Sequence, residues 1–86
     1  MYIFGGQSRV GMLNDLQIFI LNSRAWKEVR PDNIPPSPRA FSAYTQHRDD
    51  DDILHLYVFG GITNTGFDNE LYSYNTDTRQ WTWYEN

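Results

Sequence analysis

Cysteine is absent from the 86 residues of the chain. Disulfide bonds, thiolate metal sites and a cysteine nucleophile are therefore excluded. No apolar run approaches the roughly 18 residues that a membrane-spanning helix needs, no secretory signal pattern begins the chain, and no N-x-S/T glycosylation acceptor is present. These absences fit a cytoplasmic protein, and we expect that location.

Basic residues are scarce. The chain holds 7 Lys and Arg against 11 Asp and Glu, which gives a formal net charge of −4. Such a chain lacks the positive surface that binds nucleic acid or anionic membranes, so neither is an expected partner. Apolar residues with a helical period are missing too, while an aromatic share of 16% favours strands, so an all-β fold is predicted.

One pattern in the sequence occurs twice. Residues 1–31 align without a gap on residues 56–86, at an offset of 55 positions. Identical pairs include aromatic, glycine, asparagine and tryptophan positions: Tyr2/Tyr57, Phe4/Phe59, Gly5/Gly60, Gly6/Gly61, Gly11/Gly66, Asn14/Asn69, Leu16/Leu71, Arg24/Arg79 and Trp26/Trp81. The chain is therefore a tandem repeat.

Short apolar segments separated by polar or proline-rich stretches predict the strands. The predicted strands are 1–4, 15–21 and 25–29 in the first unit and 39–46, 53–61, 70–75 and 80–84 in the second. Gly5-Gly6 is predicted to turn the chain, and residues 7–13, 30–38 and 62–69 are predicted to be longer connections. If strand 39–46 is labelled a, the order is b-c-d followed by a-b-c-d, which favours antiparallel four-stranded sheets arranged radially.

Four segments of the second unit resemble kelch repeats. They are "SPRAFSAY", "LYVFGG", "NELYSYNTD" and "RQW", and most of the same pattern is present in residues 1–26. Ser42 stands where the family often has His, and Asn75 follows Tyr74 where the family has Asp. The resemblance implies a fragment of a kelch-type β-propeller with two antiparallel blades, a partial repeat at 1–30 and a second repeat at 31–86.

Several residues suggest chemistry but lack its required pattern. The Gly-Gly pairs have no helix start or lysine behind them, so a phosphate-binding loop is not predicted. The four consecutive Asp residues of "HRDDDD" do not have the alternating spacing of a calcium loop, and His47 and His55 lack a third zinc ligand. No serine has a nucleophile frame, and the signatures of kelch oxidases and of the sialidase Asp-box are not matched. No catalytic residue, metal site or cofactor is predicted.

The predicted geometry places the b–c and d–a connections at one end of the sheets. Polar loops on a rigid scaffold are common binding sites, so we expect a protein-interaction module, acting as a scaffold or adaptor, that presents these loops to a partner protein. The residues expected to contact the partner are Gln7, Ser8, Arg9, Thr63, Asn64 and Thr65. The alternatives are a non-catalytic fragment of an oxidase- or sialidase-like propeller enzyme whose active site lies elsewhere, and an excised fragment without activity.

The repeated tryptophans, Trp26 and Trp81, are predicted to pack between neighbouring sheets in the same way. Two blades would leave an apolar sheet face open on each side and an unpaired edge on the first strand b. We therefore expect the chain to be part of a larger propeller and to self-associate when it is isolated.

Overall fold

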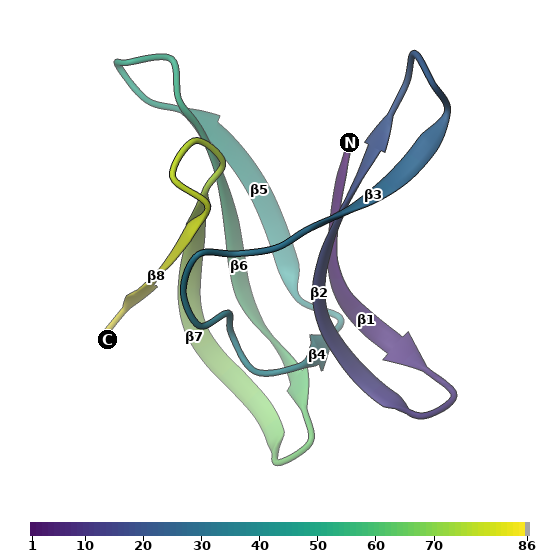
Figure 1. The fold of residues 1–86 in the computed structure, drawn as a ribbon. Helices are drawn as coiled ribbons and strands as arrows, with labels where there is room; N and C mark the ends of the chain where they lie inside the picture. The colour runs from purple at the N-terminus through teal and green to yellow at the C-terminus, as the bar shows by residue number, and fades with distance from the viewer. Residues whose placement is uncertain (86) are drawn as a thin grey trace.

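The computed structural model describes residues 1–85 and contains two antiparallel β-sheets (Figure 1). Blade 1 consists of β1 (Tyr2–Ser8), β2 (Gly11–Ile20) and β3 (Ala25–Val29). Blade 2 consists of β4 (Arg39–Ala40), β5 (Ala43–Arg48), β6 (Leu54–Thr63), β7 (Gly66–Asn75) and β8 (Gln80–Tyr84). Within residues 1–85 there is no helix that could cross a lipid bilayer.

The strand order confirms the all-β, propeller-type prediction. Blade 1 has the order β1-β2-β3, and blade 2 has the order β4-β6-β7-β8 with β5 also paired to β6. The predicted strand a at 39–46 is thus two strands along one edge of β6. They are separated at Phe41, whose φ of 60° is unusual for a bulky residue and interrupts the ladder.

The predicted turn at Gly5-Gly6 and the predicted long connections at 7–13 and 62–69 are wrong. β1 continues through both glycines to Ser8, and β6 continues to Thr63, so each b–c connection is a two-residue turn. The register shifts between Phe4 and Gly6 and again between Phe59 and Gly61, which marks a β-bulge in each blade. Glycine adopts the positive φ that such a bulge requires, and the strand therefore bends without ending.

Gly5 also permits the close approach of the two blades. A Cβ atom placed on Gly5 would lie 2.7 Å from the carbonyl oxygen of Arg39, in β4 of blade 2. Backbone cannot move aside as a flexible side chain can, so this position excludes any larger residue without displacement of β4.

Each blade has two faces, which we name by the residues they carry. The Phe–Leu face carries Phe4 and Leu16 in blade 1 and their counterparts Phe59 and Leu71 in blade 2, since these residues pair across neighbouring strands. The Trp face carries Trp26 with Phe19 in blade 1, and Trp81 with Tyr74 in blade 2.

The hydrophobic core lies between the blades, where the Phe–Leu face of blade 1 meets the Trp face of blade 2. The Trp81 ring centroid is 4.9 Å from that of Phe4 and 5.0 Å from that of Tyr74, in tilted geometry. The buried cluster is Phe4, Leu16, Leu56, Val58, Tyr74 and Trp81. Trp81 thus packs between sheets as predicted, whereas Trp26 is 51% exposed because residues 1–85 place no second sheet on its face.

Candidate protein-interaction face

The b–c turns lie at one end of the molecule, and the d–a connection runs from β3 past β8 before it reaches β4 near that end (Figure 1). We name as the loop face the turns 9–10 and 64–65 with their flanking residues, the later part of the connection (34–38), and Phe41 after β4. The remaining turns, β2–β3, β5–β6 and β7–β8, lie toward the opposite end. This arrangement follows from the antiparallel order of the strands.

A hydroxyl side chain closes each b–c turn in the same way. In blade 1, the Ser8 hydroxyl donates to the Gly11 carbonyl oxygen at 3.1 Å and accepts from the Val10 amide at 3.3 Å. In blade 2, the Thr63 hydroxyl donates to the Gly66 carbonyl oxygen at 3.0 Å and accepts from the Thr65 amide at 3.2 Å. These local bonds hold both turns in defined conformations.

The proline-rich connection is fastened to both blades by asparagine side chains. The Asn33 amide group donates to the Trp81 carbonyl oxygen at 2.8 Å and accepts from the Trp81 amide at 2.7 Å. The Asn14 amide group, on β2 of blade 1, donates to the Pro36 carbonyl oxygen at 3.3 Å. The connection is therefore held against the sheets along its length.

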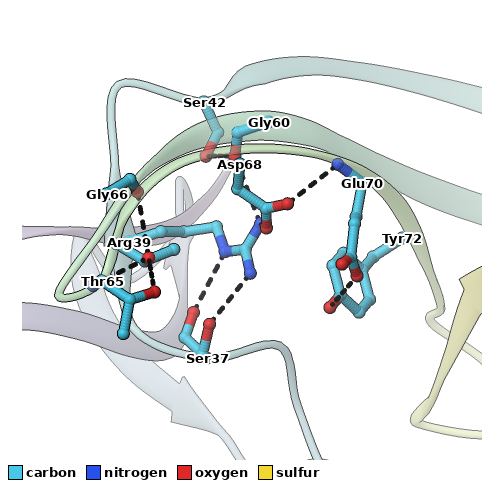
Figure 2. Close-up of polar contacts among 10 residues, drawn as sticks. Ser37, Arg39, Ser42, Gly60, Thr65, Gly66, Asp68, Glu70 and Tyr72 are labelled. Carbon is cyan, nitrogen blue, oxygen red and sulfur yellow. Dashed lines mark hydrogen bonds and ion pairs between the residues drawn. The ribbon is translucent and has the colours of Figure 1, made fainter.

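Arg39 joins the connection to the second b–c hairpin (Figure 2). Its side chain is 1% exposed, and its Nη1 lies 2.6 Å from Oδ2 of Asp68. The same guanidinium donates to the carbonyl oxygen and to Oγ of Ser37, both at 3.0 Å, and to the Gly60 carbonyl oxygen at 3.3 Å. The buried guanidinium has a carboxylate partner and several hydrogen-bond acceptors, so its charge is compensated. The network thereby holds the end of the connection against the β6–β7 hairpin.

Tyr72 and Glu70 extend the network along β7. The guanidinium carbon of Arg39 lies 5.0 Å from the centroid of the Tyr72 ring, in a cation–π contact. The Tyr72 hydroxyl donates to Oε2 of Glu70 at 3.1 Å, and the Glu70 amide donates to Oδ1 of Asp68 at 3.0 Å (Figure 2). Burial and then the Glu70 carboxylate raise the pKa of Tyr72, which keeps this phenol protonated as a donor.

The loop face carries the four most exposed large apolar side chains among residues 1–85. Their exposed fractions are 95% for Val10, 91% for Phe67, 88% for Ile34 and 78% for Phe41. Sequence reasoning missed them because it took polar loop residues as the binding set. Their positions next to glycine, proline and turn residues were the available signal, since apolar residues at such sites do not fit the strand pattern.

The predicted contact residues all lie at the two b–c turns. Gln7, Arg9, Asn64 and Thr65 are exposed, and Ser8 and Thr63 are partly buried because their hydroxyls close the turns. The structure places Arg9 and Asn64 at equivalent positions in the two blades, within two-residue turns rather than long loops. Their contact with a partner stays a prediction.

At the opposite end, Asp49 organises the "HRDDDD" turn. Its Oδ1 accepts from the amides of Asp51 and Ile53 at 2.9 and 3.0 Å, and its Oδ2 lies 2.8 Å from Nε2 of His55. The hydrogen bond with His55, followed by that with the Ile53 amide, lowers the pKa of Asp49. Among residues 1–85, no three His, Cys, Asp or Glu side chains gather into a group that could hold a metal ion.

The chain matches a kelch family model and is similar to several known proteins. Residues 1–85 match the family model described as the KLHDC2/KLHL20/DRC7 Kelch-repeats domain. The leucine-zipper-like transcriptional regulator 1 of Homo sapiens is 32% identical over 85 residues, which cover 94% of this chain and 10% of that protein. Kelch domain-containing protein 2 of Bos taurus is 36% identical over 62 residues (72% of this chain and 14% of that protein). The Rab9 effector protein with kelch motifs of Rattus norvegicus is 37% identical over 60 residues, or 70% of this chain and 15% of that protein.

Proposed function

The chain belongs to the kelch-repeat family, and we propose that it is a scaffold or adaptor module whose loop face binds a partner protein. It spans between 10% and 15% of the length of the three relatives named above, so the activity of those whole proteins is not carried over to it. One of these relatives is named as an effector protein of Rab9, which agrees with a protein-binding role for kelch repeats.

The observation that carries this proposal is the combination of a supported backbone with exposed apolar side chains. Arg39, Asn33 and the turn hydroxyls bind the loops to the sheets. Val10, Ile34, Phe41 and Phe67 are nevertheless exposed beside the polar residues of the turns. Apolar side chains ringed by polar groups on a rigid support resemble the energetically important centre of a protein interface.

The proposal has four further parts. The module acts by binding and has no catalytic activity of its own. With a net charge of −4, its partner is a protein rather than nucleic acid or an anionic membrane. Its location is the cytoplasm, a reducing compartment in which a cysteine-free domain is stabilised by its core alone. We also propose that the isolated chain associates with further copies of itself.

Quantitative affinity capture from cells tests the binding face. Arg9→Ala and Asn64→Ala, together with Phe67→Ala, are expected to lose the same partner, whereas Asp50→Ala at the opposite end is expected to retain it. The free energy of unfolding should stay within about 0.5 kcal/mol for all four, since these are surface substitutions. A partner that all three loop variants retain would refute the assignment of the loop face.

A further inference from the structure

The two outward faces of the molecule carry repeat counterparts of the aromatic residues that meet in the core. Trp26 on the open face of blade 1 is the counterpart of Trp81, and Phe59 on the open face of blade 2 is the counterpart of Phe4. Trp81 and Phe4 are 6% and 5% exposed, whereas Trp26 and Phe59 are 51% and 47% exposed. One copy of the blade–blade contact is thus made within the chain, and the aromatic residues of a second are displayed on its surface. The contacts that β4 and β5 add, Arg39 against Gly5 and Tyr44 on Phe4, have no counterpart in blade 1.

We propose that the Trp face of blade 1 binds the Phe–Leu face of blade 2 of a second copy of this chain, which repeats between molecules the contact that joins the two blades. This deepens the proposal of self-association and depends on it. In the repeated contact, Trp26 of one copy covers Phe59 of the next, as Trp81 covers Phe4 at a centroid distance of 4.9 Å.

The side chains around these aromatic residues fit the same contact. Ile3, the counterpart of the buried Val58, is exposed beside Trp26 on the open face of blade 1. The Trp26 ring is already oriented by Phe19, with centroids 5.0 Å apart, as Tyr74 orients Trp81 at the same distance. The Trp26 ring is therefore already held in the orientation that the contact needs, before a second copy binds.

The charges on the two open faces are compatible. The Trp face of blade 1 includes Gln17 and Glu28, which are paired across β2 and β3, and Asp15, whose Oδ2 accepts from Nε2 of Gln17 at 2.8 Å. The corresponding rows on the Phe–Leu face of blade 2 are Phe59–Leu71–Tyr84 and Tyr57–Ser73–Thr82, none of which is charged. Glu28 thus approaches no like charge in these rows, and the exposed Thr82 offers a hydroxyl group there.

Because the two contacting faces differ, the association is heterologous and proceeds head to tail. Each added copy repeats the rotation that relates neighbouring blades, and radial sheets of this kind close at about four to eight blades. With two blades in each copy, the expected assembly is a closed ring of about two to four copies rather than an open fibre.

Analytical ultracentrifugation of the 86-residue chain over a concentration series tests the proposal. We expect a discrete oligomer for the wild type, and at least a tenfold higher concentration for half-assembly in Trp26→Ala and in Phe59→Ala. Leu21→Ala, which removes an exposed apolar side chain from the β2–β3 turn, should assemble like the wild type. Circular dichroism at low concentration should show the same β-structure in all three variants.

Mixing the two variants provides the sharper test. Trp26→Ala retains an intact blade 2 face and Phe59→Ala retains an intact blade 1 face, so an equimolar mixture should form dimers and nothing larger. A mixture that stays monomeric, or variants that assemble like the wild type, would overturn the face assignment while leaving self-association in place. A wild type that is monomeric at all concentrations would overturn both, and polymers without a size limit would overturn the repeated blade geometry.

Discussion

Trp26 and Trp81 occupy the same position in two copies of one repeat and have opposite environments. Both lie on the Trp face of their blade, and each contacts an aromatic ring of the preceding strand at 5.0 Å. Only Trp81 is buried, because Phe4 of the other blade lies against it. The comparison shows that a blade provides one half of each core and depends on its neighbour for the other half.

The same difference recurs at other repeated positions. Asn14 bonds the connection that follows its blade, whereas its counterpart Asn69 is exposed. A Cβ atom on Gly5 would meet both Arg39 and Leu13, whereas one on Gly60 would meet Asp68 alone. Repeated residues therefore have equivalent backbone conformations. Their contributions to stability differ because different neighbouring segments contact them.

The largest expected change in stability comes from replacing the two tryptophans, which tests the comparison between them directly. Trp81→Ala should lower the free energy of unfolding by about 3–5 kcal/mol, because it removes a large buried side chain from the core. Trp26→Ala should lower it by about 1 kcal/mol or less, because the ring packs on one side only. Urea denaturation below the concentration of self-association measures both, and equal losses would contradict the assignment of the core.

The next effect concerns the buried ion pair, which only blade 2 possesses. Leu13 of blade 1 stands where blade 2 has Asp68. Arg39→Met should cost about 3–5 kcal/mol, because it leaves the largely buried Asp68 carboxylate without its cation. The double variant Arg39→Met/Asp68→Leu, which introduces the blade 1 residue, should recover part of this loss. A double variant with the full additive loss would show that the ion pair is not the source of the effect.

A smaller effect distinguishes the two bulges. Gly5 and Gly60 have φ values of 69° and 68°, so alanine at either site carries the same left-handed strain of about 1–2 kcal/mol. At Gly5 the added methyl group also meets the Arg39 carbonyl oxygen at 2.7 Å. Gly5→Ala should therefore destabilise the chain by about 1–3 kcal/mol more than Gly60→Ala in thermal denaturation. Indistinguishable melting temperatures would mean that β4 moves away freely.

The smallest expected effect concerns Tyr74, whose counterpart in blade 1 is Phe19. The Tyr74 hydroxyl is buried without a hydrogen-bond partner among residues 1–85. Tyr74→Phe should therefore leave stability at pH 7 unchanged or raise it by up to about 1 kcal/mol. A loss of more than this in urea denaturation would indicate that the hydroxyl stabilises the core.

The pH dependence of this variant has a defined sign. Burial raises the folded-state pKa of Tyr74 above its ordinary value of 10.0. Stability is therefore insensitive to this titration well below pH 10 and falls as the pH rises from 10 toward the raised pKa, since the unfolded chain ionises first. Between pH 7 and pH 10.5 the wild type should therefore lose more stability than Tyr74→Phe.

Much of the fold could be predicted from the repeat itself. The order b-c-d followed by a-b-c-d depends on the alternation of apolar and polar residues and on short turns. Each of these can be recognised within a single segment of the sequence. The bulges could not be predicted, because a glycine pair permits both a turn and a bent strand, and cross-strand pairing decides between them. The end of the sheets at which the b–c turns lie was predictable, but their two-residue length was not. The exposure of Phe41 and Phe67 depends on the direction in which each side chain leaves its strand, which the sequence pattern does not fix.

The sequence by itself determined which residues are equivalent: the tandem register assigned Trp26 to Trp81, Phe4 to Phe59 and Gly5 to Gly60 before any contact was known. Local propensity and side-chain alternation are properties of a segment, so they are the same in both repeats. Only the tertiary structure decided which member of each pair is buried or crowded, because burial is a property of two surfaces that meet. Blade 2 covers Phe4 and crowds Gly5, and blade 1 covers Trp81, while Phe59 and Trp26 face outward and Gly60 meets only its own blade.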